Sequence, residues 1–136
     1  MVITKNGNSI DLIKNKNHCN VLVIGCMHGD EPQGKYLIQE YLKSNTETKL
    51  LFIPCLNPDG IKSNTRVNAN GVDLNRNFPT KNWKLTEKNN FYGGQEPASE
   101  IETKFLINVI EEFKPKLILT LHAPYKVVNY DGDALN

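Results

Sequence analysis

The chain has 136 residues, which suits one small domain with a modest hydrophobic core, and we expect no second domain. Its formal charge of +1, from 16 Lys and Arg against 15 Asp and Glu, provides no basic field that would attract nucleic acid or an anionic membrane. No apolar stretch approaches the roughly 20 residues of a membrane span, and the start of the chain lacks the layout of a signal peptide. We therefore expect a cytoplasmic protein whose partner is a small molecule or a peptide.

The cysteines give no sign of a disulfide framework or a structural zinc cluster. Cys19, Cys26 and Cys55 form no C-x-x-C pair and are odd in number, so we expect them to be reduced and partly buried. Cys26 is expected to be a small buried residue at the end of a strand.

The first part of the chain carries little chemistry. Residues 1–13 alternate weakly between apolar and polar types around Asn6-Gly7, a dipeptide typical of hairpin turns, so we expect an edge hairpin there. His18 lies in a polar loop without an acidic or cysteine neighbour, and we expect it to be solvated.

The stretch 21–34 then combines a strand with two possible metal ligands. Val21–Ile24 is short, β-branched and closed by Gly25, which is typical of a buried parallel strand. His28 and Glu31 follow at its carboxyl end, where open α/β sheets place their sites. A histidine and a carboxylate are ligand types of catalytic zinc, although this spacing alone also fits an exposed loop pair.

Apolar patterns predict a helix and a second strand after this motif. Pro32 suits a first helical turn, and one apolar face follows, with its aromatic residues expected in the core: Tyr36, Leu37, Ile38, Tyr41 and Leu42. Leu50–Leu56 is predicted to be a buried strand. Because Pro54 cannot donate to a strand ladder, we expect this strand at an edge or a bulge.

A long stretch without apolar periodicity runs from the turn residues 57–60 to about Pro97, and loops of this length are usually functional or disordered. It contains Arg66 and Arg76, the only arginines in a chain that otherwise uses lysine for positive charge. Their planar forks suit a carboxylate or an oxyanion, although two surface cations placed by chance are the alternative.

The last clear elements are a helix and a strand. Ala98–Lys114 is predicted to be a helix with a Ser99/Glu102 capping box, and its glutamates are expected to be cap partners or solvated. Leu117–Leu121 is predicted to be a third buried strand, and His122 stands at its end. His28, Glu31 and His122 would then share one crevice as a zinc shell with an open position for water.

With these residues collected, the chain resembles the carboxypeptidase A superfamily of zinc peptidases, and within it the bacterial murein peptide amidases. Six segments match in family order over about residues 20–132: His28–Glu31, Asn57–Gly60, Arg66, Gly71–Pro79, Ser99-Glu100 and Leu121–Pro124. Ala123-Pro124 stands where digestive carboxypeptidases have Ser-Tyr. The resemblance implies a single α/β domain over residues 1–136, with a mixed, mostly parallel sheet flanked by helices but without the carboxyl-terminal strands.

The resemblance also implies roles for individual residues. His28, Glu31 and His122 are implied ligands of one Zn²⁺, and Asp73 an implied hydrogen-bond partner of a ligand histidine. Arg66 is implied to polarise the scissile carbonyl and stabilise the oxyanion. Asn75 and Arg76 are implied to hold the free carboxylate of the substrate. The implied reaction is hydrolysis of the γ-D-glutamyl to meso-diaminopimelate bond of murein peptides during cell wall recycling.

One part of the family pattern is missing. The family's general base is a glutamate well downstream of the third ligand, and no glutamate follows His122 here. Val127–Asp131 resembles the strand just before that region, so we expect an incomplete core and an exposed sheet edge that would allow self-association.

Several functions stay open at this point. The chain is expected to be the amino-terminal part of a murein amidase, with a partner chain supplying the missing half as a variant. The alternatives are a zinc- or peptide-binding protein without catalysis, and a desuccinylase or aspartoacylase relative.

Overall fold

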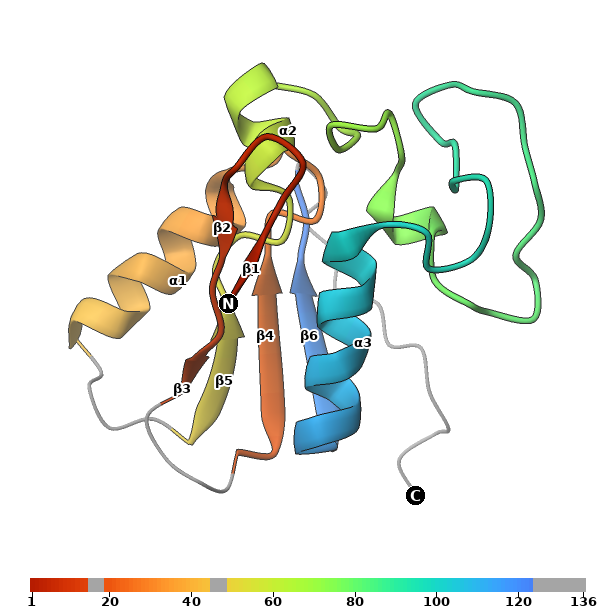
Figure 1. The fold of residues 1–136 in the computed structure, drawn as a ribbon. Coiled ribbons are helices and arrows are strands. Elements are labelled where there is room, and N and C mark those ends of the chain that lie inside the picture. The colour runs from red at the N-terminus through yellow and green to blue at the C-terminus, as the bar shows by residue number, and fades with distance from the viewer. Residues whose placement is uncertain (15–18, 45–48, 124–136) are drawn as a thin grey trace.

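The computed structural model describes residues 1–14, 19–44 and 49–123. Within these ranges the elements are β1 (Val2–Ile3), β2 (Ser9–Ile10), β3 (Ile13–Lys14), β4 (Val21–Gly25), α1 (Gln33–Ser44), β5 (Leu50–Ile53), α2 (Pro58–Ser63), the 3-10 helix η1 (Leu74–Arg76), α3 (Ile101–Phe113) and β6 (Leu117–Leu121). The main sheet has the order β3-β5-β4-β6, in which only β3 is antiparallel to its neighbour (Figure 1). This confirms the predicted mixed, mostly parallel sheet flanked by helices.

The side chains of the central strands alternate between two cores on opposite faces of the sheet. Leu22 and Ile24 of β4 pack in one core with Leu106 of α3, whereas Val23 packs in the other core with Ile38 of α1. A strand that is apolar at every position is required for such burial on both faces. Helices on both faces therefore hold the carboxyl end of β4 at a fixed place.

The amino-terminal hairpin is confirmed as a separate two-stranded sheet. β1 pairs antiparallel with β2, and the turn between them contains Gly7 with a positive φ of 79°. Ile10 from this hairpin is fully buried in the core under α3.

The turn chemistry at residues 57–60 starts a short helix rather than a free turn. The Asn57 side chain accepts a hydrogen bond from the Gly60 N–H at 2.9 Å and so acts as the N-cap of α2. A Cβ on Gly29 would collide with the backbone of Gly60, so the loop carrying His28 packs directly against α2. Residues 57–97, which were expected to form one long loop, therefore contain α2 and η1, and residues 64–73 connect these two helices.

β6 differs from the prediction of a buried strand. It pairs with β4 on one side and is the edge strand of the described sheet, and Leu117, Ile118 and Leu119 remain 47%, 40% and 43% exposed. A continuous apolar run predicts burial only if a neighbour covers it, and β6 has no second strand neighbour within residues 1–14, 19–44 and 49–123. The expected exposed sheet edge is present at this strand.

Two predictions about the α1–β5 region are wrong. Tyr36 and Leu37 are 61% and 62% exposed and Tyr41 is 39% exposed, because Ile38 and Gly34 form the face of α1 that meets the sheet. β5 is a central strand that ends at Ile53, so Pro54 lies just beyond the ladder and forces neither an edge nor a bulge.

The predicted capping box of the last helix is also wrong. The N-cap of α3 is Glu100, without a side-chain cap bond, and the Ser99 hydroxyl donates to Glu100 instead at 2.6 Å. Glu100 and Glu102 are both buried, and the Asn68 amide donates to both carboxylates. Glu100 and Glu102 are therefore buried inside the protein, and the prediction that they are solvated or act as cap partners is wrong for these two residues.

Two further predictions lie outside the described residues, namely the solvated His18 and the strand at 127–131. In the part of the chain that is described, no helix has the length and apolar character needed to cross a membrane.

Candidate metal centre

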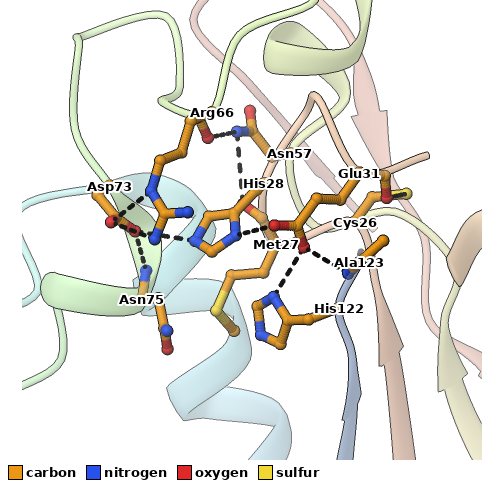
Figure 2. Close-up of polar contacts among 10 residues, drawn as sticks. All are labelled: Cys26, Met27, His28, Glu31, Asn57, Arg66, Asp73, Asn75, His122 and Ala123. Carbon is orange, nitrogen blue, oxygen red and sulfur yellow. Dashed lines mark hydrogen bonds and ion pairs between the residues drawn. The ribbon is translucent and has the colours of Figure 1, made fainter. Parts of the chain in front are cut away.

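Three predicted ligands converge beyond the carboxyl ends of neighbouring parallel strands. His28 and Glu31 lie in the loop after β4, and His122 directly follows β6 (Figure 2). His28 Nδ1 lies 3.1 Å from Glu31 Oε1, and His122 Nδ1 lies 2.9 Å from Glu31 Oε2. One potential ligand atom from each residue lies within 4.8 Å of the others. The structure thus brings together residues that are 91 positions apart in sequence.

This donor set fits zinc. In a tetrahedral site with bonds of about 2.0–2.1 Å, neighbouring ligand atoms are about 3.3 Å apart. The Glu31 carboxylate contacts His28 through one oxygen at 3.1 Å and His122 through the other at 2.9 Å, so all three side chains are near enough to hold one ion. Two imidazoles and one carboxylate also match the composition of three-ligand zinc sites that leave a fourth position open.

Asp73 contacts the His28 ring at Nε2, whereas Glu31 contacts it at Nδ1. Asp73 is fully buried at the start of η1, and its Oδ1 lies 3.1 Å from His28 Nε2. Because a carboxylate only accepts hydrogen bonds, Asp73 favours a proton on Nε2, and Nδ1, which lies beside Glu31, is then the nitrogen that would bind a metal. The role predicted for Asp73 therefore has the required geometry.

The pKa of Asp73 lies below its usual value despite the burial. Burial by itself would raise this pKa, but the hydrogen bond with His28 and the charge of Arg66 outweigh it. Arg66 donates from Nε at 3.0 Å, and its Nη2 lies 2.9 Å from the same Asp73 Oδ2. The Asn75 backbone N–H donates to Asp73 at 3.0 Å. Asp73 is thus a buried anion with donors on both oxygens.

Glu31 is held in its ionised form by similar means. Burial would raise its pKa, but hydrogen bonds from the Ala123 N–H and from the two histidines lower it below the usual value. The buried thiol of Cys26 donates to the Glu31 carbonyl at 3.4 Å, which agrees with the small, buried residue predicted there. An ionised carboxylate is the form that binds a metal.

The predicted carboxylate-binding residues lie beside this cluster and not within it. Asn75 and Arg76 are exposed, and in the described chain no hydrogen bond or ion pair joins their side chains to His28, Glu31 or His122. Both residues line a cavity of about 530 Å³ together with aromatic side chains, including Trp83 and Phe91. Asn75 connects the two features, since its backbone binds Asp73 while its residue lines the cavity.

Sequence reasoning missed three contributors to this site. The Asn57 side chain donates to the Arg66 carbonyl at 3.3 Å, the Ala123 N–H donates to Glu31 at 3.1 Å, and the Phe91 ring lies 5.1 Å from the Arg66 guanidinium carbon. Asn57 belongs to a motif that was interpreted as a turn, and the Ala123 contribution comes from a backbone group that no sequence pattern marks. The only sequence signal for Phe91 was an aromatic residue in a polar loop.

Comparisons with known proteins identify similar sequences and similar structures. The sequence pattern of the zinc carboxypeptidase family matches residues 1–135. Murein peptide amidase A of Escherichia coli K12 is 34% identical over 117 residues, which cover 76% of this chain and 48% of that protein. The crystal structure of a murein-tripeptide amidase from Escherichia coli O157 superposes with a TM-score of 0.82 at 29% identity, covering 90% of this chain and 58% of the other.

A more distant likeness concerns the fold alone. An aspartoacylase family protein from Mesorhizobium loti superposes with a TM-score of 0.58 at 22% identity, covering 82% of this chain and 33% of the other. The chain spans about half the length of the curated murein amidase relatives that it matches.

Proposed function

The chain belongs to the zinc carboxypeptidase family, and on that premise we propose that it serves zinc-dependent hydrolysis of a peptide or amide bond next to a free carboxyl terminus. The observation that carries the proposal is the convergence of His28, Glu31 and His122, with one donor atom each within 4.8 Å of the others. A zinc ion bound there supplies Lewis-acid polarisation and lowers the pKa of a water molecule.

The side chains around the ligands have complementary tasks. Asp73 fixes the tautomer and the ring orientation of His28. Arg66 uses two nitrogens on Asp73, and its third nitrogen carries no dashed line in Figure 2 and lies on the side of His28. This nitrogen has no hydrogen-bond partner among the described residues, and we propose that it stabilises negative charge that develops on a carbonyl oxygen of the substrate.

Asn75 and Arg76 are proposed to bind the free carboxylate of the substrate. They are exposed at the cavity beside the ligand cluster, and a planar guanidinium suits bidentate binding of a carboxylate. Holding that carboxylate would restrict hydrolysis to the bond that reaches the metal.

The proposed substrate class is murein peptides, with the γ-D-glutamyl to meso-diaminopimelate bond as the bond hydrolysed. Two murein peptide amidases at 34% identity, from Escherichia coli and Vibrio campbellii, support this choice. The proposal also places the protein in the cytoplasm, in the recycling of cell wall peptides.

A general base is not assigned. Glu31 is the only glutamate of the described chain that takes part in the hydrogen bonds of the site, and no glutamate follows His122 in the sequence. General acid–base catalysis contributes about 10²- to 10⁴-fold, so we expect the 136-residue chain to bind zinc and substrate but to turn over slowly.

A binding experiment tests the carboxylate site. Calorimetry of the zinc-loaded chain with L-Ala-γ-D-Glu-meso-diaminopimelate and with its carboxyl-terminal amide should show tighter binding of the free acid. Arg76→Lys should remove about 1–3 kcal/mol of that preference, because a bidentate pair becomes a single contact. Lys81→Ala, in the same loop, is the control and should leave the preference unchanged. Equal binding of acid and amide by the unmodified chain would refute the carboxylate role.

A turnover experiment separates the remaining functions. Release of diaminopimelate by the zinc-loaded chain should be at least about 10²-fold slower than release by a murein amidase that has its base. Equal rates would show that the chain contains a base that we have not assigned. Hydrolysis of N-acyl amino acids in place of the tripeptide would favour the aspartoacylase alternative.

A further inference from the structure

We propose that Phe91 is a positioning residue that holds the Arg66 guanidinium in place and couples it to the neighbouring cavity. The role of Arg66 in catalysis rests on the proposed function, whereas the contact between Phe91 and Arg66 is independent of it. The Phe91 ring centroid lies 5.1 Å from the Arg66 guanidinium carbon, within the about 6 Å range of a cation–π interaction.

Exposure of Phe91 makes a purely structural role a poor explanation. The residue is 58% exposed, and it does not belong to either hydrophobic core. A large apolar side chain in that position gives little burial to the fold. Its ring instead contacts a cation whose side chain is only 22% exposed and which is already bound on one edge by Asp73.

The backbone beside Phe91 is fastened to the site. The Tyr92 carbonyl accepts a hydrogen bond from the Asp73 N–H at 2.8 Å, and the Gly93 carbonyl accepts one from the Asn77 amide at 2.8 Å. Phe91 therefore sits at a fixed distance from the residue that also binds Arg66 and His28. The ring is held where it can restrict the guanidinium.

Two different groups then constrain the same guanidinium. Asp73 binds the Nε and Nη2 edge and so fixes the guanidinium within its own plane, whereas an aromatic ring limits rotation out of that plane. The third nitrogen keeps no hydrogen bond within the described residues and stays available to a ligand. Removing the ring should leave the ion pair intact but loosen the orientation of this nitrogen.

Phe91 also lines the cavity that contains Asn75 and Arg76. Phe91 thus borders the cavity of the residues proposed to hold a carboxylate and also contacts the arginine proposed to stabilise an oxyanion. A ligand in the cavity would press on the ring that orients Arg66. Occupancy of the cavity and the position of Arg66 are therefore coupled through Phe91.

The chain offers a direct test because it has only two arginines. In a chain labelled with ¹⁵N-arginine, NMR should show two Nε–H signals, and Arg76→Lys assigns them. Phe91→Leu keeps an apolar side chain but removes the aromatic face. It should speed hydrogen exchange at Arg66 Nε by about two- to fivefold, the size expected for an exposed cation–π contact, and leave Arg76 unchanged. Phe91→Trp should restore the slow exchange.

Controls separate positioning from general loosening. Leu85→Ala, at a residue of the same loop that is 65% exposed, should leave Arg66 exchange unchanged. If Phe91→Leu also speeds exchange of core backbone amides, Phe91→Trp decides: renewed protection of Arg66 supports the proposal, and continued fast exchange overturns it. Unchanged Arg66 exchange in Phe91→Leu overturns it outright.

Hydrolysis of the tripeptide gives a second readout. Phe91→Leu should lower kcat about two- to fivefold with little change in KM, and it should have no further effect in an Arg66→Ala background. An Arg66→Ala variant that keeps full activity would refute the proposed role of Arg66 while leaving the exchange result valid. Additive losses from the two changes would overturn the coupling.

Discussion

His28 and His122 both lie beyond the carboxyl end of a parallel strand, yet the chain holds the two side chains very differently. The His28 side chain is 3% exposed and contacts both Glu31 and Asp73. The His122 side chain is 30% exposed, and Glu31 is its only hydrogen-bond partner among the described residues. The same contrast holds for their strands, because β4 is buried on both faces and β6 is an exposed edge.

This difference shows how the site is divided. Asp73 orients His28 from a buried position in the loop before η1, whereas Glu31, the other partner of His28, also contacts His122 and Ala123 after β6. Among the described residues, His122 is positioned by its strand, by its contact with Glu31 and by the His28 ring, whose centroid lies 4.9 Å away. The ligand on the exposed strand should therefore gain most from anything that covers β6.

The largest expected effect is on the strands themselves. Leu22→Ala on β4 should lower the free energy of unfolding by about 2–5 kcal/mol, because it leaves a cavity in a fully buried position. Leu119→Ala on β6 should cost about 1 kcal/mol or less, since that side chain is 43% exposed. Urea unfolding measures both. Similar losses would show that β6 is covered in solution.

The next effect concerns the buried support of His28. Asp73→Asn should weaken zinc binding by about 10- to 100-fold, because the amide no longer fixes the imidazole proton on Nε2. Stability should fall by about 1–3 kcal/mol through the weakened contacts to Arg66. Competition with a chelator measures the affinity, and Asp30→Asn at an exposed position nearby is the matched control. Equal effects from Asp30 and Asp73 would contradict the account.

A smaller effect compares the two histidines without metal. His28→Ala should cost about 1–3 kcal/mol of unfolding free energy, because it leaves the buried Asp73 without one donor. His122→Ala should change the stability by no more than about 0.5 kcal/mol. Thermal unfolding in a chelator buffer gives both values. Equal costs would mean that the two sides of the site are equally organised.

The smallest effects come from two buried carboxylates, Glu100 and Glu102, at the start of α3. Burial and the charges of Glu100 and Asp59 raise the pKa of Glu102. The ionised Glu102 therefore destabilises the fold increasingly as the pH rises from the pKa of Glu102 in the unfolded chain to its pKa in the folded chain. Glu102→Gln should therefore become relatively more stable as the pH increases from about 4.3, the usual pKa of a glutamate.

Glu100 should behave in the opposite way. Burial would raise its pKa, but hydrogen bonds from Ser99, Asn70 and Asn68 outweigh this and lower it. Its stabilising contribution is present above the unfolded pKa and is lost as the pH falls through the folded one. Relative to the unmodified chain, Glu100→Gln should thus lose the most unfolding free energy near neutral pH. Parallel pH profiles for the two variants would contradict these opposite shifts.

Much of the sheet and the convergence of the candidate ligands could be predicted from the sequence. The apolar run at 21–24 predicts β4 because burial on both faces requires apolar residues at every position. The convergence of His28 and His122 could be predicted because each follows such a run. Arg66 and Asp73 followed from the family resemblance, and the structure places both beside His28.

The remaining features depend on neighbours that a sequence pattern does not contain. The run at 117–121 looks as apolar as β4, but its burial depends on whether another strand lies beside it. Glu102 looked like a cap residue, whereas the Asn68 amide makes its burial possible. Phe91 lies near Arg66 because the neighbouring Tyr92 carbonyl accepts a hydrogen bond from the Asp73 N–H, a contact that the sequence pattern does not reveal.

Zinc content measured after dialysis tests the central claim most directly. The unmodified chain should retain one zinc ion, and His28→Ala and His122→Ala should each retain almost none. His18→Ala, which replaces the third histidine of the chain, should keep the full amount. Retention of one zinc ion by both His28→Ala and His122→Ala would contradict a site built from His28, Glu31 and His122.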